Sequence, residues 1–395
     1  MSENGTASPW KVLCAAASGL GHLIPVMTLA TNLRDAGHDV SLLTRDDEAS
    51  GFAAENHIPG ISLPKESPTG AWEPFLAVPV LQSHHPDITI NDWDISLWLA
   101  LRAWQPACRV SILRCEQLIG YRRRNLFLPD KFGLATGRST RMFNSVLEHN
   151  GYAALGNSRE LFAGDLIVIP GVPQLDPLDE RAQDFYPTST FVYTGPLFLQ
   201  TAAPVADSLS DWLAQKRHQA VPIVLITLGT AAWGDWLYEE LANCFAGGEF
   251  AVVMTVPAES VRRELEARNL SWLRVTGMTD FLSLARHADL VVHHCGHATT
   301  QLILLAGKPS LTLPSGDYDR EDNALRLEDL DCGRHLGHDF FRRGIRQSEV
   351  AQAARELLQR SAIARGVAAM SKVLEEYVAT RGYAEFARAL ARHMA

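Results

Sequence analysis

The sequence predicts an α/β protein made of two Rossmann-like domains that face one another across a cleft. Its 395 residues are more than one hydrophobic core usually supports, so two domains are expected. Both halves of the chain also repeat the same order of a short apolar run, a glycine-containing turn and an amphipathic segment. Strand, turn, helix and strand in that order are typical of a doubly wound parallel sheet.

The first half opens with this unit. The run KVLCAAA, residues 11–17, predicts a strand, and SGLGHLIP, residues 18–25, predicts the turn. VMTLATNLRDAGH spaces its apolar residues as a helix does, and DVSLLT, from Asp39, predicts the second strand. From Trp93 to Glu180 the chain is aromatic and irregular, and its pattern assigns no elements.

The second half repeats the unit. PIVLITLGT (Pro222–Thr230) predicts a strand ending in a glycine turn, AVVMTV, ADLVVHH and PSLTLP predict further strands, and DWLYEELANCFA and TTQLILLA predict helices. We expect an N-terminal domain over 1–200, a linker over 201–215 that opens with the Ala-, Pro- and Ser-rich TAAPVADSLS, and a C-terminal domain over 216–375. The last stretch, 376–395, predicts a helix that could pack back on the N-terminal domain.

The composition limits the class of protein. A net charge of −9 argues against a nucleic-acid binder, because binding phosphates needs clustered cations. The six cysteines form no CxxC pair, which favours reduced, mostly buried thiols. The N-terminus lacks the basic and apolar parts of a signal peptide, and no apolar run reaches the ~18 residues that span a bilayer. We expect a soluble, cytoplasmic protein without a transmembrane segment, and the sequence leaves open whether it forms a homodimer.

The stretch HHCGHATTQLILLAGKP, residues 293–309, carries the strongest functional signal. A buried strand ends at His293 or His294, a glycine turn follows, and a helix is expected to start near Ala298 or Thr299. Such a turn points unpaired backbone N–H groups and the positive end of the helix dipole out of the sheet edge. Hydroxyls of Thr299 and Thr300 would occupy capping positions. The site suits a diphosphate, to which His294 and His297 could donate further hydrogen bonds.

Other interpretations of this stretch exist. His293, His294, Cys295 and His297 are residue types that bind zinc, but adjacent residues on a strand point to opposite faces, and no second ligand cluster follows at a standard spacing. Cys295 as a nucleophile would lack an acid to orient its base. Without further context, the histidines would simply satisfy polar groups of a loop.

Further residues carry a resemblance to a known family. His294-Cys295-Gly296-His297-Ala298-Thr299, then Gly307-Lys308-Pro309, and DREDNA (Asp319–Ala324) after Pro314 resemble the nucleotide-sugar-binding signature of GT-B glycosyltransferases. The similarity is to the family of plant secondary-product and bacterial antibiotic (macrolide-type) glycosyltransferases. SGLGHLIP resembles that family's N-terminal turn, and YTGPL (Tyr193–Leu197), DWL and ITLGT resemble later segments. Residues 95–185 hardly take part.

The resemblance implies an inverting glycosyltransferase. A hydroxyl or amine of a small, hydrophobic natural-product acceptor would attack the anomeric carbon of a nucleoside diphosphate sugar. His22 corresponds to the family's general base, which takes the acceptor's proton. Asp92, in PDITIND, corresponds to the carboxylate that orients this base. Asp92 could instead cap the helix that ISLWLALRAW predicts, and Asp94 is the second candidate for the carboxylate.

The resemblance also implies a donor site in the C-terminal domain that needs no metal and no other cofactor. A helix terminus, a histidine and a glycine turn would neutralise the diphosphate there. The implied donor-binding residues are Gly229, Thr230, Met278, His294, Gly296, His297, Thr299, Asp319, Arg320 and Asn323. Asp-x-Asp pairs occur, but a chain with this much Asp is expected to contain about one by chance.

Four positions depart from the family pattern. Leu302 stands where the family usually has a Glu that holds both ribose hydroxyls, and relatives that use thymidine diphosphate (TDP) deoxysugars often lack this Glu too. This favours a TDP-deoxysugar donor over a UDP-sugar. Arg320 replaces a sugar-binding Gln, Ala298 replaces Gly or Asn, and GMTD (277–280) replaces the usual base-binding segment, although Met278 could still pack on the base.

Two other functions stay open at this stage. A degenerate GT-B protein would bind a nucleotide or a partner without catalysis, which Leu302 favours and the retained His22 and Asp92 oppose. A sugar-nucleotide epimerase would share the fold, but the carboxylates that its chemistry needs cannot be placed. Trp93, Trp98, Trp104 and the stretch Tyr121–Arg124 could line an acceptor pocket, or the tryptophans could belong to the core.

Overall fold

A computed structural model of the chain describes residues 8–63, 75–114, 137–178, 181–199, 204–229, 235–313, 318–337 and 346–395. The chain divides into two compact units. The N-terminal unit comprises residues 1–198 and 380–395, and the C-terminal unit comprises 199–379. None of the helices in the described ranges is long and apolar enough to cross a membrane.

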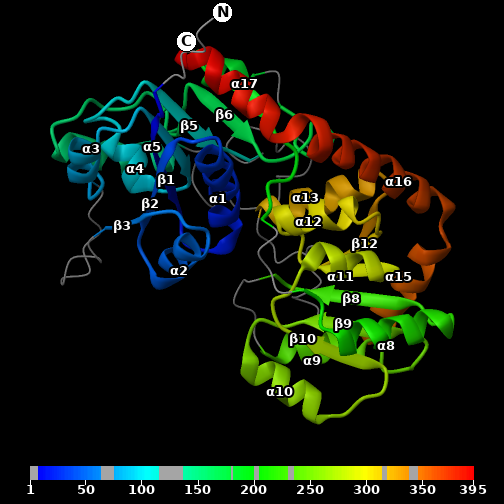
Figure 1. Ribbon diagram of the computed structural model, residues 1–395. Coiled ribbons are helices and arrows are strands. Elements are labelled where there is room, and N and C mark those ends of the chain that lie inside the picture. The colour runs from blue at the N-terminus through cyan, green and yellow to red at the C-terminus, as the bar shows by residue number, and fades with distance from the viewer. Residues whose placement is uncertain are drawn as a thin grey trace, which may run out of the picture. The chain divides into compact units, whose positions relative to one another are not determined.

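The N-terminal unit is built on a seven-stranded parallel sheet with the strand order β3-β2-β1-β4-β5-β6-β7 (Figure 1). The strands are β1 (Lys11–Ala16), β2 (Asp39–Thr44), β3 (Gly60–Ser62), β4 (Ile88–Asp92), β5 (Cys108–Ile112), β6 (Leu166–Ile169) and β7 (Thr190–Tyr193). Buried apolar side chains run along both faces of the central strands, as in sheets covered by helices on both sides. The strand order reverses between β1 and β4, and ligands bind at such a reversal, outside the carboxyl ends of the strands.

Helices cover this sheet. They are α1 (Leu20–Asp35), α2 (Asp47–Glu55), α3 (Val78–His84), α4 (Ile95–Ala100), α5 (Arg138–His149), α6 (Arg159–Phe162), α7 (Ala182–Phe185) and α17 (Gly382–Met394). Although α17 comes from the end of the chain, it packs against β5, β6 and β7 (Figure 1). The chain therefore returns to the N-terminal unit through its last helix.

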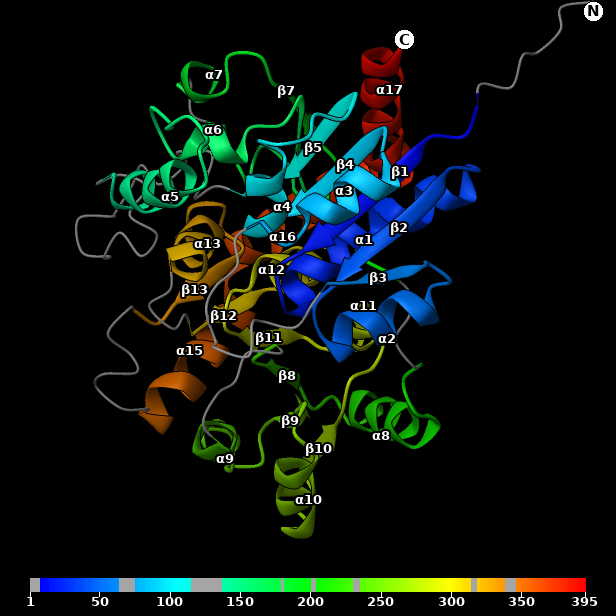
Figure 2. The ribbon, with the colours of Figure 1, turned by 90° about the vertical axis from the view of Figure 1, so that its left-hand side faces the viewer.

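The C-terminal unit is built on a six-stranded parallel sheet with the order β10-β9-β8-β11-β12-β13. The strands are β8 (Ile223–Thr227), β9 (Ala251–Thr255), β10 (Leu273–Thr276), β11 (Leu290–His293), β12 (Ser310–Thr312) and β13 (Gly333–His335). The helices are α8 (Asp207–His218), α9 (Asp235–Asn243), α10 (Glu259–Ala267), α11 (Phe281–His287), α12 (His297–Leu305), α13 (Tyr318–Asp329), α15 (Gln347–Gln359) and α16 (Ser361–Glu376), followed by a π-helical turn (Tyr377–Arg381). Figure 2 and Figure 1 both place α9 and α10 at the β8–β10 end of the sheet. The strand order reverses here between β8 and β11.

The expected linker is shorter than 201–215. Residues 207–218 form α8, because Leu209, Trp212 and Leu213 recur at the spacing of one helix face and are buried in the core of the C-terminal unit. The Ala, Pro and Ser content of the segment hid this spacing.

Candidate active site

One candidate site lies at the carboxyl ends of β1 and β4, in the N-terminal unit. After β1 the chain turns through Gly19, whose φ of 101° suits a residue without a side chain, and α1 begins at Leu20. The backbone N–H of His22 donates to the carbonyl of Gly19 at 3.1 Å, which places His22 in the first turn of α1. Its Nδ1 lies 2.8 Å from Oδ1 of Asp92, the last residue of β4. The imidazole is 32% exposed, and the Asp92 side chain is fully buried.

Arg114 also binds this carboxylate, through both of its oxygens. Its Nη1 donates to Oδ1 of Asp92 at 2.8 Å and its Nη2 to Oδ2 at 2.7 Å, and Nη2 also donates to the carbonyl of Gly21 at 2.9 Å. Burial by itself would raise the pKa of Asp92, but the charges of Arg114 and His22 and their hydrogen bonds hold it below its ordinary value. The group next to His22 is therefore a carboxylate, which can only accept, so Nδ1 carries the proton and Nε2 is the basic nitrogen.

The capping role falls on Asp94 rather than on Asp92. The Asp94 carboxylate accepts from the backbone N–H of Leu97 at 2.8 Å and caps α4. It also pairs with Arg45, whose Nε lies 2.6 Å from its Oδ2. Asn91 closes the turn, because its side chain bonds both the N–H and the C=O of Asp94. Asp92 is thus left to contact His22.

Sequence reasoning missed Arg114. It follows β5 by two residues, and β5 lies next to β4 in the sheet, so the carboxyl ends of the two strands are neighbours. The short strand-type run VSIL before this arginine is the signal that could have found it. That run lies in the irregular region where no strand was assigned.

Another candidate site lies at the carboxyl ends of β8 and β11, in the C-terminal unit. β11 ends at His293, and the turn His294–Gly296 leads into α12. The imidazole of His294 is 5% exposed and lies between two glycines. A Cβ at Gly229 would lie 2.5 Å from its Cε1, and a Cβ at Gly296 would lie 2.6 Å from its Nε2. The absence of side chains at Gly229 and Gly296 therefore leaves the space that the His294 ring occupies.

The start of α12 corrects the expected capping. The helix begins at His297 with Gly296 as the N-cap, and no side chain caps it. Thr299 and Thr300 lie inside the helix, and the N–H of Thr300 already bonds the carbonyl of Gly296 at 2.9 Å. α12 begins directly after β11 at the carboxyl edge of the sheet, and the first turn of a helix in this position presents backbone N–H groups at that edge.

The other predicted donor residues occupy the same sheet edge. Asn323 of α13 is 5% exposed and donates its Nδ2 to the carbonyl of Cys295 at 3.0 Å, so it fixes the turn before α12. Met278 follows β10 and is 60% exposed. Asp319 and Arg320 lie, partly exposed, in the first turn of α13, and Nε2 of Gln301 lies 3.1 Å from Nδ1 of His297. Thr230 lies outside the described residues.

The cysteine and the first histidine of this stretch are buried. Burial raises the pKa of Cys295 well above its ordinary value and lowers that of His293 to about 3. The backbone N–H of Cys295 donates to Nδ1 of His293 at 3.2 Å. The thiol is therefore protonated, which makes it neither a nucleophile nor a metal ligand in this state.

A group of possible metal ligands lies elsewhere. Within the described ranges, one group of three possible ligands has its ligand atoms within 4.8 Å of one another, namely Cys108, Asp165 and His393. They lie at the amino ends of β5 and β6, the edge opposite His22. Asp165 already accepts from the backbone and the guanidinium of Arg109.

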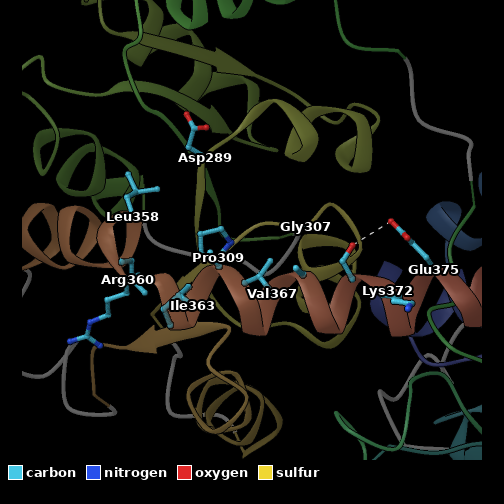
Figure 3. A pocket seen from close by; sticks show the side chains of 13 residues that line it. Asp289, Gly307, Pro309, Leu358, Arg360, Ile363, Val367, Lys372 and Glu375 are labelled. Carbon is cyan, nitrogen blue, oxygen red and sulfur yellow. Dashed lines mark hydrogen bonds between the residues drawn. The ribbon is translucent and has the colours of Figure 1, made fainter.

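A cavity of about 520 Å³ in the C-terminal unit also lies away from His294 (Figure 3). Asp289 and Pro309, which border it, precede β11 and β12, so it opens at the amino ends of these strands. Ile363 and Val367 of α16 form its apolar side. Gly307, at the same place, has a φ of 71° and terminates α12, so this part of the signature serves the helix end.

Of the two roles that the sequence left open for the tryptophans, acceptor pocket or core, the structure favours the core. Trp98 is 2% exposed, and its Nε1 lies 3.2 Å from the hydroxyl of Ser111. Trp93 and Trp104 pack against the same cluster. The stretch Tyr121–Arg124 lies outside the described residues.

The contact between Gly229 and His294 predicts a stability effect. Gly229→Ala should lower the free energy of unfolding of the C-terminal unit by about 1–3 kcal/mol, because the residue has a φ of 68° and its Cβ would meet the buried ring. Denaturant unfolding followed by circular dichroism measures this. Gly247→Ala is the matched control, since a Cβ there meets open space. Equal stability of the two variants would contradict the tight fit of the ring.

Comparison with known proteins identifies the fold. No family model and no curated protein matches the sequence. Solved structures match over nearly the whole chain. The spinosyn forosaminyltransferase SpnP has a TM-score of 0.71 at 17% identity, covering 97% of this chain and 99% of its own. The calicheamicin glycosyltransferase CalG4 has a TM-score of 0.69 at 16% identity, covering 98% and 99%. LpCGTa, solved in complex with UDP, has a TM-score of 0.68 at 18% identity, covering 98% and 100%. The chain has the fold of these glycosyltransferases, and the predicted fold class, two parallel-sheet units of the GT-B type, is confirmed.

Proposed function

We propose that this protein is an inverting glycosyltransferase that moves a sugar from a nucleoside diphosphate sugar to a hydroxyl or amine of a small, hydrophobic acceptor. The observation that carries the proposal is the 2.8 Å contact between His22 and the buried carboxylate of Asp92. A partly exposed imidazole whose Nδ1 is held by a carboxylate has the tautomer that a general base needs. Of the similar structures named above, one is a forosaminyltransferase, one is a glycosyltransferase and one was solved with UDP, which supports the same chemistry.

The proposed reaction is a single displacement. Nε2 of His22 takes the acceptor's proton while the acceptor oxygen or nitrogen forms a bond to the anomeric carbon. The bond from that carbon to the diphosphate breaks on the opposite face, and the diphosphate leaves with the electron pair. Asp92 stabilises the imidazolium that forms. The configuration at the anomeric carbon is inverted.

The donor is proposed to bind the C-terminal unit without a metal. The N-terminus of α12 and the turn that holds His294 offer backbone N–H groups and a positive dipole end to the diphosphate. Leu302 on α12 is partly exposed, and its side chain accepts no hydrogen bond from a ribose hydroxyl. A deoxyribose loses nothing there, so a TDP-deoxysugar is favoured over a UDP-sugar.

A thermal-shift titration with TDP, UDP, GDP and ADP, with and without magnesium, tests this donor site. We expect TDP to raise the unfolding temperature most, and magnesium to add nothing. A ligand that binds only the native state at 100 times its Kd adds about 2.7 kcal/mol of stability. Preference for UDP would overturn the inference from Leu302 but keep the donor site, and no response to any nucleotide would contradict the donor site itself.

Leu302 also favours a second function, a GT-B protein that binds a nucleotide or a partner without catalysis. The His22–Asp92 contact opposes it, because a protein that does not catalyse transfer has no use for an oriented base. Nucleotide binding without turnover of any nucleotide sugar, including its hydrolysis by water, would favour this function.

A further inference from the structure

We propose that Arg114 is a third member of the His22–Asp92 site, a positioning residue that holds Asp92 as a carboxylate facing His22. The inference rests on the proposed function for its catalytic meaning, but the arrangement itself does not depend on that function. The site then consists of the base His22, the carboxylate of Asp92 and the guanidinium of Arg114, which bonds Asp92 and the carbonyl of Gly21.

The geometry joins three segments of the unit. The guanidinium of Arg114 grips both carboxylate oxygens of Asp92, at 2.8 and 2.7 Å, in the two-pronged manner that fixes a carboxylate in its plane. The 2.9 Å bond from its Nη2 to the carbonyl of Gly21 reaches the residue before His22. Arg114 therefore fixes the acid at the end of β4 and, through the first turn of α1, the backbone of the base.

Asp92 needs this ion pair with Arg114 to stay ionised, because of the charges and the burial around it. The Asp92 side chain is fully buried, and a buried carboxylate without a counter-charge takes up a proton. The charged groups that act on it are Arg114 and, when protonated, His22. Arg45, which follows β2, pairs with Asp94 instead. Among the described residues, Arg114 is therefore the permanent cation that keeps Asp92 ionised.

Loss of the grip would impair the base in either of two ways. If Asp92 becomes protonated, its O–H donates to Nδ1 of His22, the ring proton moves to Nε2, and Nε2 loses its basic lone pair. If Asp92 stays ionised, removal of the neighbouring cation makes the imidazolium easier to form, so His22 holds a proton at higher pH. Both ways displace the active form, neutral His22 beside ionised Asp92, to higher pH.

The test compares full-length wild type with Arg114→Met and Arg114→Gln. Met removes the charge and the hydrogen bonds, whereas Gln removes the charge but can still bond Asp92. Arg45→Met is the matched control, since it removes a similar arginine from the neighbouring Asp94. The first readout is hydrogen exchange at the imidazole C2 of His22, followed by mass spectrometry across pH, which needs no substrate. The second is the pH dependence of kcat/KM for sugar transfer.

We expect Arg114→Met to displace the acidic limb of the kcat/KM profile upward by about one pH unit or more and to change the C2 exchange profile of His22. Arg45→Met should change neither. A merely structural role would lower the rate equally at every pH and leave the limb in place, which would overturn the proposal. If Arg114→Met does not fold, the same two readouts on Arg114→Gln, which also lacks the charge, test the proposal.

The two readouts separate this inference from the proposed function. A changed C2 exchange profile in a protein that turns over no nucleotide sugar would support the link from Arg114 to His22 and refute the transferase. If Arg114→Gln is active and both its exchange profile and its acidic limb match those of wild type, the proposed role of Arg114 is refuted and the proposed transferase function is not.

Discussion

Replacing His22 by alanine should lower kcat/KM for sugar transfer about 10²–10⁴-fold, the usual contribution of a positioned general base. The substitution removes Nε2, the atom that takes the acceptor's proton. It leaves the donor site untouched, because the proposed donor residues lie in the C-terminal unit. Nucleotide binding, measured by calorimetry, should therefore stay within about twofold of wild type, while the loss falls on kcat. Hydrolysis of the donor by water serves as the assay until an acceptor is found, because water must also lose a proton.

His149→Ala is the matched control for this variant. His149 is an exposed histidine in the last turn of α5, in the same unit, and is not among the proposed site residues. A His22→Ala rate close to that of His149→Ala would refute His22 as the base. A loss of nucleotide affinity that accounts for the whole loss of rate would place His22 in donor binding instead.

Replacing Asp92 by asparagine should affect both activity and stability. The amide no longer orients the proton of His22 onto Nδ1, and the buried guanidinium of Arg114 loses its counter-charge. Breaking a buried ion pair by removing one partner costs about 3–5 kcal/mol. We expect a loss of that size in the unfolding free energy and a fall in kcat of about 10²–10⁴-fold. Urea unfolding and donor hydrolysis measure the two effects.

Two controls separate the effect of the Asp92–Arg114 ion pair from the effects of the single substitutions. The double variant Asp92→Asn/Arg114→Gln carries no unpaired charge, so it should be more stable than the sum of its single variants predicts. The pH dependence gives a second check. The folded-state pKa of Asp92 lies below its ordinary value, so its contribution to stability is complete above the pKa of about 3.8 that an unfolded Asp has, and is lost as the pH falls through the lower folded value. Asp92→Asn should flatten this acid limb, and an unchanged limb together with additive stabilities would contradict the ion pair.

Local sequence pattern predicted the strands and turns of the fold well. The runs at residues 11–17 and from Asp39 are β1 and β2, and the strand expected to end at His293 or His294 ends at His293. These runs are continuous and apolar because parallel strands are buried on both faces, and glycine turns delimit them. The start of α12 was placed one or two residues late, since hydroxyls at Thr299 and Thr300 were taken as caps where the N-cap is Gly296.

Contacts between distant strands could not be predicted from pattern. His22 and Asp92 were named through a resemblance, but their contact depends on β4 lying beside β1, a pairing that no local periodicity encodes. The same holds for Arg114, which reaches Asp92 because β5 lies beside β4. In the region from Trp93 to Glu180, the short helix α4 is buried on nearly all sides, so its sequence lacks the amphipathic spacing that marks a helix.

The most direct test of the proposed function is a proton NMR time course of an α-configured TDP-sugar with wild type and with His22→Ala, in the presence of a panel of small hydrophobic acceptors and without magnesium. We predict that wild type releases TDP and forms an equal amount of β-linked product, and that His22→Ala does so about 10²–10⁴-fold more slowly. A product that keeps the α configuration, or equal rates in the two proteins, would contradict an inverting transferase with His22 as its base.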